Sequence, residues 1–169
     1  EYEMLCKAVG GNYISFETPS PNKINPFQLP PAEKSSPDEM NYKHLFLTSL
    51  LKIMLGEISP DQDAILNQAI NLTYQQRNIT QDPSTHNNPP PRMEDLYKVL
   101  IGMEQEPAQS LARRLEKFVK GGLRGIFDQQ SNIDLDSPMT VFSLKETADE
   151  IRPIIMFMIL DFIWTQIRR

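Results

Sequence analysis

Residues 154–160 read Ile-Ile-Met-Phe-Met-Ile-Leu and are apolar on every face of the helix that they predict. Such a helix is stable only where other elements cover it on all sides. A membrane span needs about 20 apolar residues, and this run is shorter and meets Asp161, so we predict no transmembrane segment. The pattern instead indicates a helix buried between the layers of a larger sheet domain, with Pro153 in its first turn.

Short elements at the two ends of the chain are typical of α/β proteins. Residues 2–9 predict a helix that ends at Gly10-Gly11, and residues 13–16 predict a strand bounded by Pro19 and Pro21. Residues 139–144 predict a second strand. The apolar stripe of the first helix comprises Tyr2, Leu5, Cys6 and Val9.

The termini suggest that the sequence belongs to something longer. The chain starts at Glu1 in mid-pattern and stops at Arg169 directly after its most apolar stretch. A single short strand beside that stretch could not cover the apolar helix. We therefore expect an internal piece of a larger protein, in which other elements complete the sheet.

Four amphipathic helices are predicted in the middle of the chain. Ser36-Pro37-Asp38-Glu39 and Ser59-Pro60-Asp61-Gln62 match the capping box, so we expect helices from there to about Leu55, with Gly56 as the stop, and to about Asn78. After a linker with three consecutive prolines, residues 93–105 and 107–119 predict two more. The residues expected on the inward faces are Leu47, Leu50, Leu51, Met54, Ile65, Leu66, Ala69, Ile70, Thr73, Met93, Leu96, Leu100, Met103, Leu111, Leu115, Phe118 and Val119.

These elements divide the chain into three regions. We expect residues 1–35 to be a fragment of an α/β core, residues 36–125 to form a helical subdomain, and residues 126–169 to return to the core. Hydrophobic residues make up 40% of the sequence, which argues against a wholly disordered chain. The formal net charge of −5 disfavours a chain-wide electrostatic grip on nucleic acid or anionic lipid.

Nucleotide-binding motifs are absent from the sequence. No G-x-x-x-x-G-K-[ST] loop and no G-x-G-x-x-G occurs, and no apolar strand ends in Asp-Glu. The glycine-rich segment from Lys120 to Gly125 follows a predicted helix, whereas a phosphate cradle follows a strand. We interpret it as a helix end, and we name no catalytic residue and no cofactor-binding residue.

Metal binding and nucleophilic catalysis also have little support. His44 is predicted inside a helix and His86 in the polar linker, without the spacing of zinc ligands. Asp134 and Asp136 lack the loop spacing of a calcium site, so we predict no metal site. Cys6 is the only cysteine, which excludes an intramolecular disulfide, and we expect it to be a small buried thiol.

One basic cluster leaves two interpretations open. It could be the solvated face of an amphipathic helix, with cations near the negative end of the helix dipole. It could instead contact a nucleotide phosphate on a neighbouring subunit or a DNA backbone. The cluster comprises Arg113, Arg114, Lys117, Lys120 and Arg124, and Arg168-Arg169 adds little information.

The order of several short motifs resembles a known family. The chain opens with Glu1-Tyr2-Glu3-Met4-Leu5, then Gly10-Gly11-Asn12-Tyr13-Ile14-Ser15-Phe16, and continues with Ile24-Asn25-Pro26-Phe27. This order is similar to the region after the second core strand in conjugative-transfer ATPases of type IV secretion systems, in the HerA/FtsK-like P-loop group. In that family a helical insertion follows.

The tail resembles the same family. Asn132-Ile133-Asp134-Leu135 and Thr140-Val141-Phe142-Ser143-Leu144 look like the strand that re-enters the core, and Arg152-Pro153 through Trp164 looks like the helix before the Asp-Glu strand. The resemblance implies an α/β parent with a RecA-like P-loop NTPase core, of which this chain is a mostly α-helical part. It also implies that the phosphate-binding loop precedes Glu1 and that the Asp-Glu strand follows Arg169.

The resemblance carries further expectations about function. The parent would be an ATPase that uses ATP and Mg²⁺ to power conjugative DNA or protein transfer and pilus assembly, whereas this chain alone would be inactive and bind neither. Its partners would be further subunits, in a hexamer, and secretion-channel proteins, with DNA as a candidate substrate. It would lie in the cytoplasm, at the cytoplasmic face of the membrane. Glu1 and Tyr2 would lie near the nucleotide without being catalytic.

A different class of protein explains the same apolar helix. The chain could be a non-enzymatic helical module that binds a partner protein through this apolar helix, exposed on its surface. Such a module would fold cooperatively from these residues alone. The two hypotheses differ in what covers the apolar helix.

Overall fold

The computed structural model describes residues 2–17 and 20–167, so the expectations for Glu1, Pro19, Arg168 and Arg169 lie outside the described residues. Within the described part the chain is mostly helical, with seven α-helices, two 3-10 helices and two strands. The elements are α1 (Tyr2–Ala8), β1 (Asn12–Ser15), η1 (Ala32–Lys34), α2 (Glu39–Leu55), α3 (Pro60–Gln75), η2 (Pro83–Asn87), α4 (Met93–Gly102), α5 (Glu106–Val119), α6 (Arg124–Phe127), β2 (Thr140–Ser143) and α7 (Arg152–Ile167).

The two strands form a parallel pair. Asn12 lies opposite Thr140 and Ser15 lies opposite Ser143. Both predicted strands are confirmed, each within one residue of its expected bounds. The expectation that residues 132–135 belong to the second strand is wrong, because that segment is tied to β1 through the Asn12 side chain, which donates to the Asp134 carbonyl at 3.1 Å, and not through a backbone ladder. Parallel neighbours need a long crossover, so the chain between the strands must leave the sheet and return.

Helix α1 is connected to β1 by a turn that requires both glycines. Gly10 has a φ of 71°, which side chains rarely adopt. At Gly11 a Cβ would lie 2.6 Å from the Met139 carbonyl oxygen and 2.8 Å from the Cys6 sulfur. Cys6 is buried as predicted, but the remaining apolar stripe of α1 is exposed in this structure.

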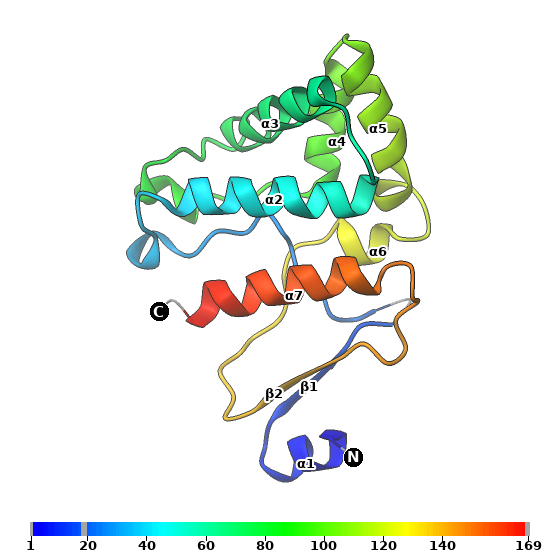
Figure 1. Cartoon of the computed structure of the whole chain (residues 1–169). Coiled ribbons are helices and arrows are strands. Elements are labelled where there is room, and N and C mark those ends of the chain that lie inside the picture. Colours follow the sequence, from blue (N-terminus) through cyan, green and yellow to red (C-terminus); the bar gives the residue numbers. More distant parts are fainter. Residues whose placement is uncertain (1, 18–19, 168–169) are drawn as a thin grey trace.

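Helices α2–α5 pack on one another at the end of the molecule away from α1 (Figure 1). Most of the predicted inward residues are buried, and Ile65 and Met103 are partly buried against the same core. Helix α2 ends at Leu55 with Gly56 at a φ of 77°, as expected. Helix α3 ends at Gln75, three residues earlier than predicted, and Asn78 instead occupies a left-handed turn with a φ of 54°.

The two predicted capping boxes differ in the structure. At α3 the box is confirmed: the Ser59 hydroxyl accepts from the Gln62 amide at 3.2 Å, and the Gln62 side chain accepts from the Ser59 amide at 2.9 Å. At α2 the prediction is wrong. The helix begins at Glu39, whose side chain is buried, and Ser36 contributes only its carbonyl, which accepts from the Glu39 amide at 3.1 Å. Residues 36–38 form a turn before the helix instead of its first turn.

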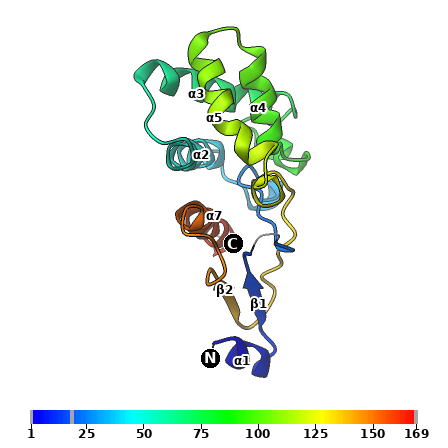
Figure 2. The ribbon, with the colours of Figure 1, turned by 90° about the vertical axis from the view of Figure 1, so that its right-hand side faces the viewer.

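Helix α7 lies between α2 and the strand pair (Figures 1 and 2). It runs antiparallel to α2, since Lys43 pairs with Asp161 while Phe46 stacks on Phe157. The faces toward α2 and the strands are buried. Met156, Leu160 and Trp164 are 48%, 59% and 59% exposed, so in this structure α7 has one open apolar stripe and is not covered on every face. Among residues 2–17 and 20–167, no helix combines the length and apolar character needed to cross a bilayer.

The unequal capping boxes give a matched pair of variants. Ser59→Ala removes the acceptor for the Gln62 amide and should lower the free energy of unfolding by about 1 kcal/mol. Ser36→Ala should leave it nearly unchanged, because the Ser36 side chain does not cap α2. Urea denaturation measures both, and equal losses would contradict the assignment.

Candidate functional site

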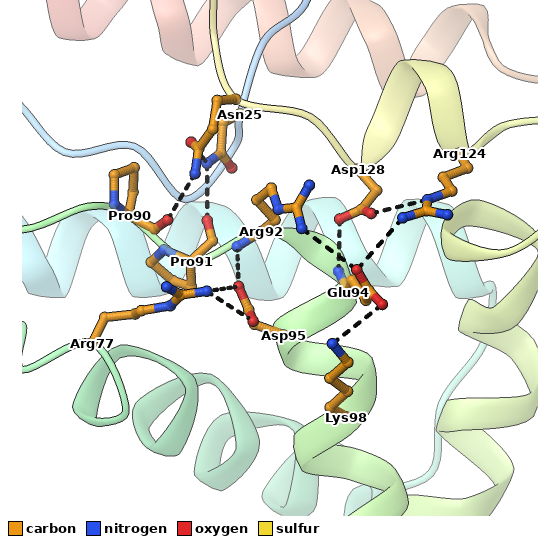
Figure 3. Close-up of polar contacts among 11 residues, drawn as sticks. Asn25, Arg77, Pro90, Pro91, Arg92, Glu94, Asp95, Lys98, Arg124 and Asp128 are labelled. Carbon is orange, nitrogen blue, oxygen red and sulfur yellow. Dashed lines mark hydrogen bonds and ion pairs between the residues drawn. The ribbon is translucent and has the colours of Figure 1, made fainter.

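The Asn-Pro-Phe segment passes beneath the four-helix region and joins it to the strand side of the molecule. Asn25 is buried, and its side-chain amide donates to the Pro91 carbonyl and to Gln130 Oε1, both at 2.8 Å (Figure 3). Its Oδ1 accepts from the Phe27 amide at 3.1 Å, while its backbone amide donates to Ser131 Oγ at 2.7 Å. An aspartate could not supply the two donors, so the position requires an amide.

Phe27 anchors the same segment in the helical core. Its ring is fully buried and lies 5.9 Å, centroid to centroid, from the ring of Tyr74 on α3. The Tyr74 hydroxyl donates to the Phe27 carbonyl at 2.7 Å. Burial raises the pKa of Tyr74 well above its usual value near 10, and the charge of Asp161 raises it further.

Three acidic side chains, Glu94, Asp95 and Asp128, lie at the start of α4, close to the Asn-Pro-Phe segment (Figure 3). Asp128 is fully buried; its Oδ1 accepts from the Glu94 amide at 2.9 Å, and its Oδ2 lies 3.4 Å from Arg124 Nε. Asp95 accepts a hydrogen bond from the Arg92 backbone amide at 2.8 Å. Its two carboxylate oxygens also accept from Arg77 Nη2, at 2.9 and 3.0 Å. Carboxylates are stabilised at a helix N-terminus, so these groups fasten α4 in place.

Glu94, in the first turn of α4, lies close to three cationic side chains. Its carboxylate lies 3.2 Å from Lys98 Nζ, 3.5 Å from Arg92 Nη2 and 3.7 Å from Arg124 Nη2. All three separations are long for charge-assisted hydrogen bonds. The arrangement is a structural ion network, and it holds no nucleophile with an adjacent base.

A cavity of about 210 Å³ lies between the Asn-Pro-Phe segment, α2 and α7. A buried ion pair stands in its wall: Lys43 Nζ lies 2.7 Å from Asp161 Oδ2, and the two side chains are 3% and 17% exposed. The remaining lining residues are Ile24, Asn25, Gln28, Leu29, Pro30, Pro31, Lys34, Phe162, Thr165 and Gln166. Pockets for drug-sized ligands are about 300–1,000 Å³, so this cavity is too small for a nucleotide.

All five residues of the basic cluster form ion pairs or hydrogen bonds with other groups of this chain. Arg113 pairs with Glu106 at 2.7 Å on the surface of α5. Arg114 instead points toward the α2–α3 connection, where it donates to the carbonyls of Leu55 and Glu57 at 3.0 and 2.8 Å and to Gln62 Oε1 at 3.0 Å. Arg114 therefore organises a loop.

The other cations of the cluster are also paired. Lys117 lies 3.4 Å from Glu150 and Lys120 lies 3.3 Å from Glu116. Hydrogen bonds to Tyr97 and then to Glu116 raise the pKa of Lys120. Lys120 is the C-cap of α5, so the glycine-rich segment begins at a helix end as predicted, while its last two residues, Arg124 and Gly125, open the four-residue α6.

The remaining candidate residues are dispersed. His44 contacts Asn67 Oδ1 at 2.7 Å, and the buried His86 contacts Ser35 Oγ and the Thr80 carbonyl at 2.8 and 2.9 Å. Asp134 accepts from the Asp136 amide at 2.9 Å in an exposed turn. Among the residues that the structure describes, no group of three or more His, Cys, Asp or Glu side chains could hold a metal ion. Tyr2 is exposed on α1.

The sequence alone does not predict the contacts of Asp161, Asn25 and Asp128, for a different reason in each case. Asp161 had a visible signal, because it is the single charge that interrupts an apolar run, but its partner Lys43 lies 118 positions away. Asn25 belongs to a recognisable motif, but the motif does not indicate which acceptors its side-chain amide reaches. Asp128 had no signal in the sequence, because its role depends on the start of α4 lying beside it.

Comparison with known proteins identifies the fold. No protein-family model matches the sequence, and no curated protein sequence matches it. Among solved structures, the chain is similar to VirB4 of Thermoanaerobacter pseudethanolicus, with a TM-score of 0.85 and 22% sequence identity over 99% of this chain. The chain spans less than half, 46%, of the VirB4 chain. It therefore has the fold of one part of VirB4.

The two neighbouring arginines of α5 provide a test of the loop assignment. Arg114→Ala should lower the free energy of unfolding by about 2–3 kcal/mol, because three hydrogen bonds to a charged group are lost. Arg113→Ala should cost less than about 1 kcal/mol, as is usual for an exposed ion pair. Thermal and urea unfolding compare the two, and a larger effect at Arg113 would overturn the assignment.

The raised pKa of Tyr74 predicts that the free energy of unfolding decreases at alkaline pH. Its folded-state pKa is raised, so its stabilising contribution is complete below about pH 10, the pKa in the unfolded chain, and is lost as the pH rises toward the folded-state pKa. The free energy of unfolding should fall by about 1.4 kcal/mol per pH unit above pH 10 from this group. Tyr74→Phe should remove that part of the slope, whereas Tyr2→Phe, at an exposed position, should retain it.

Proposed function

We propose that the chain is part of a motor ATPase of a type IV secretion system, which powers conjugative DNA or protein transfer and pilus assembly. The observation that carries the proposal is the similarity to VirB4, a type IV secretion ATPase, over 99% of the chain. The motif order at both ends supports it independently: the Gly-Gly turn, the strand and the Asn-Pro-Phe segment precede the helices, and a strand and an apolar helix follow them.

In this proposal the chain contributes architecture and not catalytic groups. The phosphate-binding loop and the Asp-Glu strand belong to parts of the parent outside residues 1–169, and ATP and Mg²⁺ bind there within a RecA-like core. The parallel β1–β2 pair is compatible with such a core, since parallel strands normally have both faces covered by helices. The chain on its own would hydrolyse no ATP.

The helical region would move as a unit during the ATPase cycle. Its helices pack on one another. Its attachment to the strand side includes the Asn25 and Asp128 contacts and the α2–α7 contact, where the hydrophobic core is continuous. The proposed partners are further subunits of the same ATPase, in a hexamer, and secretion-channel proteins at the cytoplasmic face of the membrane. DNA is a candidate substrate of the parent.

The open stripe of α7 favours a second candidate of another class. Met156, Leu160 and Trp164 form an exposed apolar row, which would suit a non-enzymatic module that binds a partner protein. In the ATPase proposal the remaining core of the parent covers this row. Sequencing the gene beyond both ends of the chain separates the two proposals.

The ATPase proposal predicts a G-x-x-x-x-G-K-[ST] loop upstream and an apolar strand ending in Asp-Glu downstream. Replacing the loop lysine by alanine in the intact protein should lower the rate of ATP hydrolysis at least about 100-fold, because the lysine neutralises phosphate charge. Arg113→Ala in the same protein is the matched control and should retain the wild-type rate. An intact protein without nucleotide binding would refute the proposal.

A further inference from the structure

The Lys43–Asp161 ion pair is an unusual feature of an otherwise apolar contact between two helices. Its atoms are 2.7 Å apart, and Lys43 Nζ also lies 4.9 Å from the centroid of the Phe46 ring. A buried ion pair is a poor source of stability, because the cost of removing two charges from water offsets most of their attraction. Its presence therefore calls for a role other than stability.

The middle of helix α7 has few polar groups besides Asp161 that could determine how the helix is rotated. Between Ile154 and Trp164 every residue except Asp161 is apolar, and most are Ile, Leu or Met of similar volume. Rotation by one residue would bury another set of aliphatic side chains with a similar transfer free energy. Apolar burial thus holds α7 against α2 without selecting one orientation.

Close packing around the ion pair does not select one rotation of α7 either. The cavity of about 210 Å³ borders both Lys43 and Asp161, so the packing around the pair is incomplete. The stacking of Phe46 on Phe157, 5.2 Å between ring centroids, is partly exposed and involves flat, adaptable surfaces. Only one rotation and one register of α7 bring Asp161 to Lys43.

We propose that the Lys43–Asp161 pair is a positioning device that fixes the rotation and register of α7 on α2. A single polar group in an apolar helix contact can select one arrangement among several of similar stability. In this protein the selected arrangement turns Met156, Leu160 and Trp164 outward and Met158 inward. The ion pair thereby decides which face of α7 is presented to whatever packs on it.

The native methionines allow a direct test in the chain of residues 1–169, where no further part of a larger parent covers Met156. Met156 is 48% exposed and Met158 is 3% exposed on the same helix, while Met93 on α4 is fully buried and reports general unfolding. In wild type, mild peroxide should oxidise Met156 more than about tenfold faster than Met158, as exposure dictates. In Lys43→Leu/Asp161→Leu, which keeps the contact apolar, the ratio should fall below about threefold while Met93 stays protected.

Two further results decide the proposal. The charge-exchanged variant Lys43→Asp/Asp161→Lys should restore the protection of Met158, because it restores the pair in the same place. An unchanged Met156 to Met158 ratio in the double-leucine variant would overturn the proposal, since apolar packing alone would then position α7. Simultaneous oxidation of Met93 would also overturn it, because the pair would then maintain the fold as a whole.

Discussion

The parallel pairing of β1 with β2 is the constraint on which the rest of the structure depends. Parallel neighbours cannot be joined by a tight turn, and here they lie at opposite ends of the chain. Everything between them forms one long connection, in which α2–α5 pack on one another and share a continuous hydrophobic core with the strands and α7. This connection leaves and returns at one place, where the side chain and backbone of Asn25 join Pro91 to Gln130 and Ser131.

The charged residues serve mainly to hold this long connection together. Arg114 closes the α2–α3 connection, Asp128 fastens the start of α4, and Lys43 joins α2 to α7. Each of these side chains is engaged by partners within the chain, although Arg114 Nε and Asp128 Oδ2 make no hydrogen bond. This distribution agrees with the proposal that the chain has an architectural role within a larger protein.

Local patterns predicted the helices well and their exact starts less well. Ser36 and Ser59 stand in equivalent Ser-Pro-Asp sequences, yet only Ser59 caps a helix. At α2 the first helical residue, Glu39, is buried, and Ser36 accepts the Glu39 amide through its carbonyl instead of through its side chain. Likewise, the basic cluster had two interpretations in sequence, and the positions of Leu55, Glu57 and Gln62 decided in favour of a structural role for Arg114.

The sequence by itself determined the order of elements, the inward faces of the four helices and the need for cover on α7, because hydrophobic period, capping and glycine turns act over a few residues. Only the tertiary structure decided that Lys43 meets Asp161, that Asp128 caps α4 and that Met156 faces outward. These outcomes depend on pairs of residues far apart in the chain. A side chain's partner across such a distance is set by how the helices pack, and no local pattern encodes it.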